Sequence, residues 1–471
     1  MRTHAAGLGA ALFLGGTLAA GVASADGGTP RAFEMIAEPG NPDDLVLRSD
    51  FWGFYRTRDG GKTWSWTCAE AYGVDSKSPN HLGIAVATGG RVLVARYGHG
   101  VEYTDDGCTW SSLPAFAGLY VSDVRATLNG VYVVTSPSAN GDASFTGYVY
   151  VSSDGGSEFS PKGSPLPPNF GARQFAVAPS DPKRWYVSGR ELEATPGTLM
   201  RSEDEGATWD ATTVPLTDPF MGLRIAGVDP ANPDVVFLWG DTLEDPGGVA
   251  SPDQLWVSDD GGKTVRQILE SPHDLPGFAF SPDGTDVYVG GIAAGLLHAR
   301  VADVLAQGQS AFQQALTGSA RPTDKDRRVW GLYFGPNGLT AGVDNFTRAG
   351  VPAFSYGSWI ADDHDFSKLM DICDPDYAAC APSTKTGSVC ASVFSSPGGY
   401  EPDFIQNSGR CDPRPGDAGF RPDLLSPSAT SGKDSSGCAV ALSSKTATGG
   451  VFFLMSALGA FALVRRRSRK R

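Results

Sequence analysis

Residues 57–64 read TRDGGKTW, and variants of this octapeptide begin again at Thr104, Ser152, Ser202 and Ser258. The aspartate of such a segment can accept hydrogen bonds from backbone N–H groups of the turn that follows, and glycine supplies positive φ. A closing Trp or Phe would then return to the hydrophobic layer. Each copy therefore predicts a hairpin turn whose aspartate is structural rather than catalytic. The residues given this role are Asp59, Trp64, Asp106, Trp110, Asp154, Phe159, Asp204, Trp209 and Asp260.

A second element accompanies the octapeptide. Residues 175–187, 225–238 and 278–289 each place a Pro, Asp or Gly turn between two apolar segments, which predicts strand, turn and strand. Together with the hairpin around the octapeptide, this gives four strands per repeat.

These units resemble the Asp-box repeats, also called BNR repeats, of sialidases, sortilin-type receptor ectodomains, xyloglucanases and photosystem assembly factors. All of those are β-propellers, so the resemblance implies an all-β propeller. Repeat units start near Phe33, Leu82, Val121, Phe175, Leu223, Phe278 and Val329. We therefore expect seven four-stranded blades over residues 33–372. Six is the alternative, because the last two repeats lack a good copy of the octapeptide.

The two ends are typical of an exported chain. Residues 1–25 combine a basic start, an apolar stretch and a small-residue cleavage site, which indicates a signal peptide rather than an uncleaved anchor. Residues 446–464 are uncharged and mostly apolar, long enough for a transmembrane helix, and a basic cluster follows them.

The chain has seven cysteines, and an exported protein permits disulfides. Four of them lie in residues 373–437, which suggests a small disulfide-rich appendage over residues 373–425 and a linker over residues 426–437. Zinc binding is a weaker alternative. Cys68 and Cys108 are placed to bridge adjacent blades. The disulfide candidates are Cys68, Cys108, Cys373, Cys380, Cys390 and Cys411.

Cys438 remains unpaired in this scheme. Residues 438–471 resemble the myxobacterial C-terminal sorting tag (MYXO-CTERM), in which a cysteine precedes a hydrophobic segment and a basic terminus. The resemblance implies that a membrane-embedded sorting protease removes the tail and that Cys438 carries a lipid. The protein would then be anchored at the outer membrane and cell surface, with release from it as a further option. The alternative is a plain tail anchor.

The formal net charge is −14, and it becomes more negative when the basic residues of the two ends are set aside. An acidic surface disfavours nucleic acid and anionic membranes as partners. We expect membrane contact through the C-terminal anchor only. No cofactor and no metal site are expected, because the histidines are scattered and phosphate-binding or metalloprotease motifs are absent.

Loops on the face opposite the octapeptide turns are the candidate binding region. Arg48, Arg96 and Arg190 each lie near the end of an expected second strand and would bind a carboxylate if they converged, as the arginine triad of sialidases does. The candidate ligand-binding residues are Trp52, Tyr97, His99, Arg48, Arg96, Arg190, Glu191 and Asp241.

No pair of catalytic residues stands out in the sequence. The leading hypothesis is therefore a non-catalytic surface propeller that binds an extracellular protein or a glycan. The alternative is a sialidase-like or xyloglucanase-like glycoside hydrolase with a carboxylate pair on the loop face. Action as an assembly factor is a third possibility.

Overall fold

The computed structural model describes residues 32–49, 53–74, 82–96, 99–137, 146–191, 197–217, 221–242, 252–272, 274–291, 294–315, 328–336, 338–344, 355–359, 366–371, 376–377 and 380–395. All of them belong to one compact unit, Met1–Gly419. The second unit, Phe420–Arg471, lies outside the described residues, and so do the signal peptide, the linker and the sorting tag expected from the sequence.

The described strands form sheets in which consecutive strands pair antiparallel. Sheet 1 has β1 (Ala32–Glu38), β2 (Asn41–Ser49), β3 (Phe54–Thr57), β4 (Ser65–Thr67) and, beyond β4, β29 (Asp376–Tyr377). Sheet 2 has β5 (Leu82–Val86), β6 (Val92–Arg96), β7 (Gly100–Thr104) and β8 (Ser111–Ser112). Sheet 3 has β9 (Val121–Thr127), β10 (Gly130–Thr135), β11 (Val149–Ser152) and β12 (Ser160–Lys162).

The remaining sheets repeat this order. Sheet 4 has β13 (Phe170–Ala178), β14 (Asp181–Glu191), β15 (Gly197–Ser202) and β16 (Asp210–Val214). Sheet 5 has β17 (Met221–Val228), β18 (Val236–Thr242), β19 (Asp253–Ser258) and β20 (Arg266–Ser271). Sheet 6 has β21 (Gly277–Phe280), β22 (Asp286–Gly291), β23 (Gly295–Arg300) and β24 (Gln313–Gln314). Sheet 7 has β25 (Arg328–Gly335), β26 (Gly338–Asp344), β27 (Ser355–Trp359) and β28 (Phe366–Asp371).

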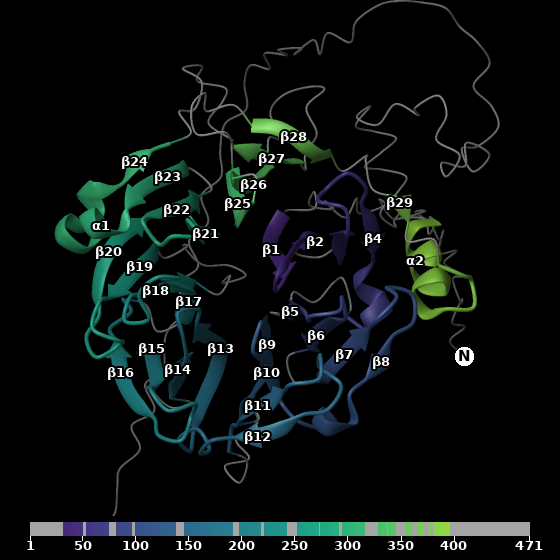
Figure 1. Cartoon of the computed structure of the whole chain (residues 1–471), viewed down its shortest axis with the longest axis horizontal. Helices are drawn as coiled ribbons and strands as arrows, with labels where there is room; N and C mark the ends of the chain where they lie inside the picture. The colour runs from purple at the N-terminus through teal and green to yellow at the C-terminus, as the bar shows by residue number, and fades with distance from the viewer. Residues whose placement is uncertain are drawn as a thin grey trace, which may run out of the picture. The chain divides into compact units, whose positions relative to one another are not determined.

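The first strand of each sheet lies on the inner side, next to the centre around which the sheets are arranged (Figure 1). β1 packs against β5, the contacts continue through β9, β13, β17, β21 and β25, and β25 returns to β1. This closed ring of sheets is a β-propeller. The expectation of uniform four-stranded blades holds for six sheets and is corrected at sheet 1, where β29 adds a fifth strand parallel to β4.

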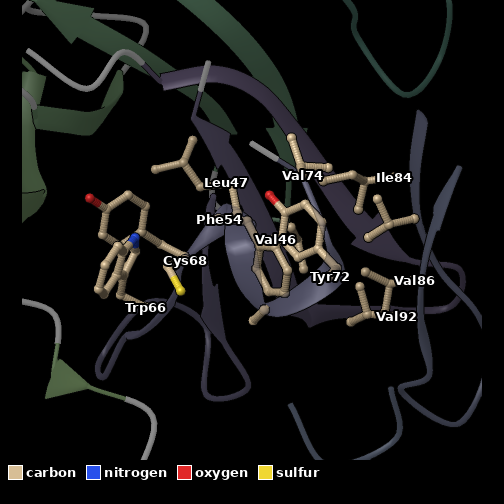
Figure 2. Packing of buried hydrophobic residues seen from close by; sticks show 14 of the residues in the cluster. Val46, Leu47, Phe54, Trp66, Cys68, Tyr72, Val74, Ile84, Val86 and Val92 are labelled. Carbon is tan, nitrogen blue, oxygen red and sulfur yellow. The ribbon is translucent and has the colours of Figure 1, made fainter. Parts of the chain in front are cut away.

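The hydrophobic core is divided among the junctions between neighbouring sheets. Figure 2 shows one junction, where Val46 and Phe54 of sheet 1 belong to the same buried cluster as Ile84 and Val92 of sheet 2. Because each sheet packs on both faces, strands such as β6 are buried on both sides and read as continuous apolar segments.

The octapeptide and its four variants, of which the one at Thr104 is one residue shorter, form tight turns between the third and fourth strands of sheets 1 to 5, here called the Asp-Gly turns. In the first, Asp59 Oδ1 accepts the Thr63 N–H at 2.9 Å and the Thr57 hydroxyl at 2.8 Å. The Thr57 oxygen accepts the N–H of Gly61, whose φ is 91°. Asp260 repeats these contacts with Thr264 and Ser258. Trp64 and Trp110 are buried, whereas Phe159 and Trp209 are partly buried.

Short helices occupy the connections in other places. They are η1 (Ala69–Tyr72), η2 (Pro114–Phe116), α1 (Val301–Gln307), η3 (Gly308–Ala311) and α2 (Lys385–Ser395). In sheet 6 the connection from β23 to β24 consists of α1 and η3, which explains why the sequence has no octapeptide there. No helix within the described ranges is long and apolar enough to span a membrane, and the expected span 446–464 lies outside them.

The C-terminal segment 380–395 is attached to the propeller by two disulfides. Cys68 pairs with Cys390 and Cys108 with Cys380, over sequence separations of 322 and 272 residues. The expected bridge between Cys68 and Cys108 is therefore wrong, and two of the appendage cysteines do not pair within the appendage. Each cysteine on sheet 1 or 2 meets one on this segment instead. Cys373, Cys411 and Cys438 lie outside the described residues.

Hydrogen bonds fix the same segment to sheet 2. The Thr386 hydroxyl accepts the indole N–H of Trp110 at 3.1 Å and donates to the Gly107 carbonyl at 2.9 Å. The Thr386 N–H donates to the carbonyl of Cys108. The side chain and the backbone of Thr386 thus bind the second Asp-Gly turn next to its disulfide. We call segment 380–395 the clasp.

Peptide mapping of the non-reduced protein should recover Cys68 linked to Cys390 and Cys108 linked to Cys380. Replacing Cys68 and Cys390 by Ser should lower the free energy of unfolding by about 2–4 kcal/mol, because the unfolded chain regains the freedom that a long loop constraint removes. Thermal unfolding measures this loss, and Ser111→Ala on the exposed strand β8 is the control. Recovery of a peptide linking Cys68 to Cys108 would contradict the structure.

The Asp-Gly turns predict that the fold weakens in acid. Slight burial opposes ionisation of Asp59 and Asp260, but the hydrogen bonds from Thr63 and Thr264 outweigh it and lower each pKa to about 2. Hydrogen bonds also lower the pKa of Asp154. A carboxyl group whose pKa is lowered in the folded state stabilises the fold at pH values above its unfolded-state pKa of about 4. This stability is lost as the pH falls toward 2.

Thermal unfolding between pH 5 and pH 2 tests this, since the melting temperature should fall across that window. Asp260→Ala should melt lower than the wild type at pH 6 and lose less on acidification. An equal loss in both proteins would show that this turn does not contribute. Asp123 acts with the opposite sign, because burial raises its pKa although Arg125 partly offsets the effect.

Candidate functional site

A cavity of about 330 Å³ lies among the first strands of the propeller, and we call it the axial pocket. Its walls come from β1, β9, β13, β17, β21 and β25, with additional side chains from β2 and β18. Its lining includes Phe33, Glu34, Arg48, Arg125, Gln174, Arg224, Trp239, Phe278 and Leu332.

Glu34 joins two sheets at this pocket. Its carboxylate accepts a hydrogen bond from Arg48 Nε at 3.1 Å and another from Arg125 Nη1 at 3.0 Å. Arg48 also lies over the ring of Phe33, 4.5 Å from its centroid. Sheets 1 and 3 are not consecutive in the ring, so this carboxylate connects blades that do not share a sheet-to-sheet core.

Asp123 is the most buried carboxylate of the network, with 2% of its surface exposed. It accepts Arg125 Nε at 2.9 Å and the backbone N–H groups of Val124 and Phe175, each at 3.0 Å. The last of these bonds reaches sheet 4. Three donors of fixed geometry hold both oxygens, which identifies Asp123 as a structural group that orients Arg125.

A second carboxylate pairs with two further arginines. Asp241 lies 3.2 Å from Arg173 Nη2 and also forms an ion pair with Arg224. Arg173 crosses the neighbouring strand at Gly222, where a Cβ atom would lie 1.1 Å from its Nη1. The position thus requires glycine because an arginine from sheet 4 occupies the space of a side chain on sheet 5.

The pKa shifts follow from these pairs. Burial opposes ionisation of Glu34, but the charges of Arg125 and Arg48 outweigh it and hold its pKa below the usual 4.5. Burial lowers the pKa of Arg48, whereas Asp123 and Glu34 raise that of Arg125 above its usual range despite burial. At neutral pH the pocket therefore contains ionised Glu34 next to charged arginines.

The sequence-based candidates are only partly brought together. Arg48 lines the pocket and Asp241 lies next to it. Arg96 instead pairs with Glu102 at 3.4 Å, and Arg190 is exposed, so neither lines the pocket and the expected arginine triad is not formed there.

The other candidates lie elsewhere. Glu191 is exposed at the end of β14, and His99 is exposed in a turn where its N–H donates to the Arg96 carbonyl. Trp52 and Tyr97 lie outside the described residues.

Most of the charged residues of the site were not among the candidates predicted from the sequence. Glu34, Asp123, Arg125, Arg173 and Arg224 all occur in the first strand of a sheet. Their signal was a charged residue inside an otherwise apolar strand, as in the β17 sequence MGLRIAGV. In a propeller the first strand of each sheet lies next to the central axis. A charged residue in such a strand therefore indicates a polar site near the axis.

No family model matches the sequence. The chain is similar to a xyloglucanase of Hypocrea jecorina (strain QM6a), with 30% identity over 110 residues, which is 21% of this chain and 12% of that protein. Among solved structures, the GH74 xyloglucanase from Xanthomonas campestris aligns with a TM-score of 0.43 and 17% identity, over 69% of this chain and 55% of its own. YCF48 from Cyanidioschyzon merolae aligns with a TM-score of 0.43 and 11% identity, over 67% and 92%.

Gly222→Ala should lower the melting temperature markedly, because the new methyl group displaces Arg173 from Asp241. Arg173→Ala removes the group with which the methyl clashes. The double variant should therefore lose less stability than the sum of the two single variants, and a double-mutant cycle measures the difference. Additive losses would mean that the two positions do not interact.

Proposed function

We propose that this protein is an exported, non-catalytic propeller that binds a glycan through its axial pocket. The observation that carries the proposal is the composition of the pocket wall. Phe33, Trp239 and Phe278 are partly exposed aromatic rings, and the same pocket is lined by Arg48, Arg125 and Arg224. Aromatic faces combined with a few placed polar donors are the usual composition of a small-ligand site.

The carboxylates of the site support binding rather than hydrolysis. A glycoside hydrolase needs one carboxylic acid that is protonated near neutral pH and a second carboxylate as base or nucleophile. Glu34 has a lowered pKa and Asp241 is held by two arginines. Asp123 has a raised pKa, but it does not line the pocket and both of its oxygens accept hydrogen bonds from fixed donors. None of these groups has the properties of a general acid.

A second candidate is a glycoside hydrolase, and the sequence similarity to the Hypocrea jecorina xyloglucanase favours it. The 110 matched residues are 12% of that enzyme, so the similarity by itself carries over neither its catalytic residues nor its binding residues. In this case the carboxylate pair would lie on the loops of the face opposite the Asp-Gly turns.

The cellular location is part of the proposal. The resemblance of residues 438–471 to a sorting tag supports anchoring at the cell surface through Cys438, after a sorting protease removes the tail. The Asp-box resemblance of the repeats and the disulfides of the clasp agree with an exported propeller.

A glycan array probed with the full chain, together with hydrolysis assays on polysaccharides, tests the function. We expect saturable binding without release of reducing ends. Trp239→Ala should weaken binding about tenfold through loss of ring contact. Tyr103→Ala, on β7 and outside the pocket, is the control. Turnover that disappears when one acidic loop residue is replaced would establish the hydrolase instead.

A further inference from the structure

The axial pocket carries more positive than negative charge. Among its lining residues are three arginines, Arg48, Arg125 and Arg224, and one carboxylate, Glu34. Their paired neighbours outside the lining add one arginine, Arg173, and two carboxylates. The described network therefore has four arginines and three carboxylates, which leaves about one positive charge without an internal counterpart at neutral pH.

Two buried donors of the pocket wall have no acceptor among the described residues. They are Arg224 Nε and Trp239 Nε1. The two residues are direct partners in the register of β17 and β18, so the donors belong to one part of the wall. Buried N–H groups are nearly always hydrogen-bonded, and leaving one unmade costs about 1–3 kcal/mol. Both nitrogens are covered in this structure, so a ligand or solvent acceptor reaches them only after a side-chain shift.

The adjoining part of the wall is apolar. Phe278 and Leu332, from sheets 6 and 7, line it, and the ring of Phe278 lies edge-on to Trp239 with centroids 6.0 Å apart. A ligand that satisfies both parts carries an anionic group at one end and a ring or apolar face at the other. A volume of about 330 Å³ is at the small end for ligand sites, which fits one sugar residue.

We propose that the axial pocket selects an acidic sugar, with the carboxylate of a single hexuronate residue bound by Arg224 and Arg48 and its ring beside Trp239. This inference rests on the proposed function and names its ligand class. Arginine suits a carboxylate because its planar fork donates two parallel hydrogen bonds. One negative charge balances the surplus of the network, whereas a doubly charged phosphate or sulfate would leave an excess of negative charge in the pocket.

Isothermal titration of the full chain with matched oligosaccharides tests the inference. The probes are an oligosaccharide that ends in glucuronate and the same oligosaccharide ending in glucose. We expect the wild type to bind the acidic probe at least about tenfold more tightly, with the preference shrinking as salt is raised. Arg224→Gln and Arg48→Gln should each remove most of the preference for the acidic probe.

Arg201→Gln is the matched control, because Arg201 also pairs with two carboxylates, Glu203 and Asp210, but lies outside the pocket. It should keep the full preference. Arg224→Lys keeps the charge without the fork and should fall between wild type and Arg224→Gln. Melting temperatures of all variants identify any that fail to fold, and Arg224→Lys remains informative if Arg224→Gln does.

Equal affinity for the acidic and neutral probes would overturn the acidic-sugar inference and leave glycan binding intact. A preference that survives in both pocket variants would overturn it too, because the charge would then be recognised elsewhere. Binding of neither probe, with binding of acidic peptides instead, would overturn the proposed function itself.

Discussion

The close approach of the first strands around one axis is the constraint on which the rest of the structure depends. These strands pack against one another in a closed ring, so each must leave room for side chains of its neighbour. Gly83 on β5 does so for Asp123, whose Oδ1 would lie 2.5 Å from a Cβ atom at that position, and Gly222 on β17 does so for Arg173. The small residues make room for charged ones, and the axis becomes a polar network instead of an aliphatic core.

That network distributes the cost of burying charge. An isolated ion in a protein interior costs several kcal/mol, and one unpaired arginine would destabilise the ring. Glu34 is shared between Arg48 and Arg125, and Asp241 between Arg173 and Arg224. The pairs connect sheets 1, 3, 4 and 5, whereas sheets 6 and 7 face the pocket with apolar groups. The pocket is amphipathic because the ion pairs occupy only one part of the ring.

The local sequence was sufficient to predict the repeat but not the site. Each expected repeat start, from Phe33 to Val329, lies in the first strand of a sheet, because turn chemistry and strand length are encoded within a few residues. The pocket depends on pairs such as Glu34 and Arg125, 91 positions apart, and Arg173 and Asp241, 68 positions apart, which only ring closure brings together. Arg48, Arg96 and Arg190 look alike in sequence, yet Arg96 has Glu102 as a local partner and Arg190 faces outward. The predicted bridge between Cys68 and Cys108 was wrong for a related reason, since no local sequence pattern shows which sheets the clasp contacts.

Closure of the ring between sheets 7 and 1 also accounts for the position of the clasp. Apart from β29, every described sheet consists of strands consecutive in the chain, so sheets 1 and 7 meet through packing of β1 on β25. Gly331 permits this contact, since a Cβ atom there would lie 3.0 Å from the Cα of Glu34.

After β28 the chain leaves sheet 7 and reaches sheet 1 through β29, and the disulfides then bind the clasp to sheets 1 and 2. The chain that leaves sheet 7 is thus tied by disulfides to sheets 1 and 2. These bonds oppose the separation of sheet 7 from sheet 1. Glu34 and Arg48 stand on one side of this junction and Leu332 on the other, so the junction that the clasp spans is also part of the pocket wall.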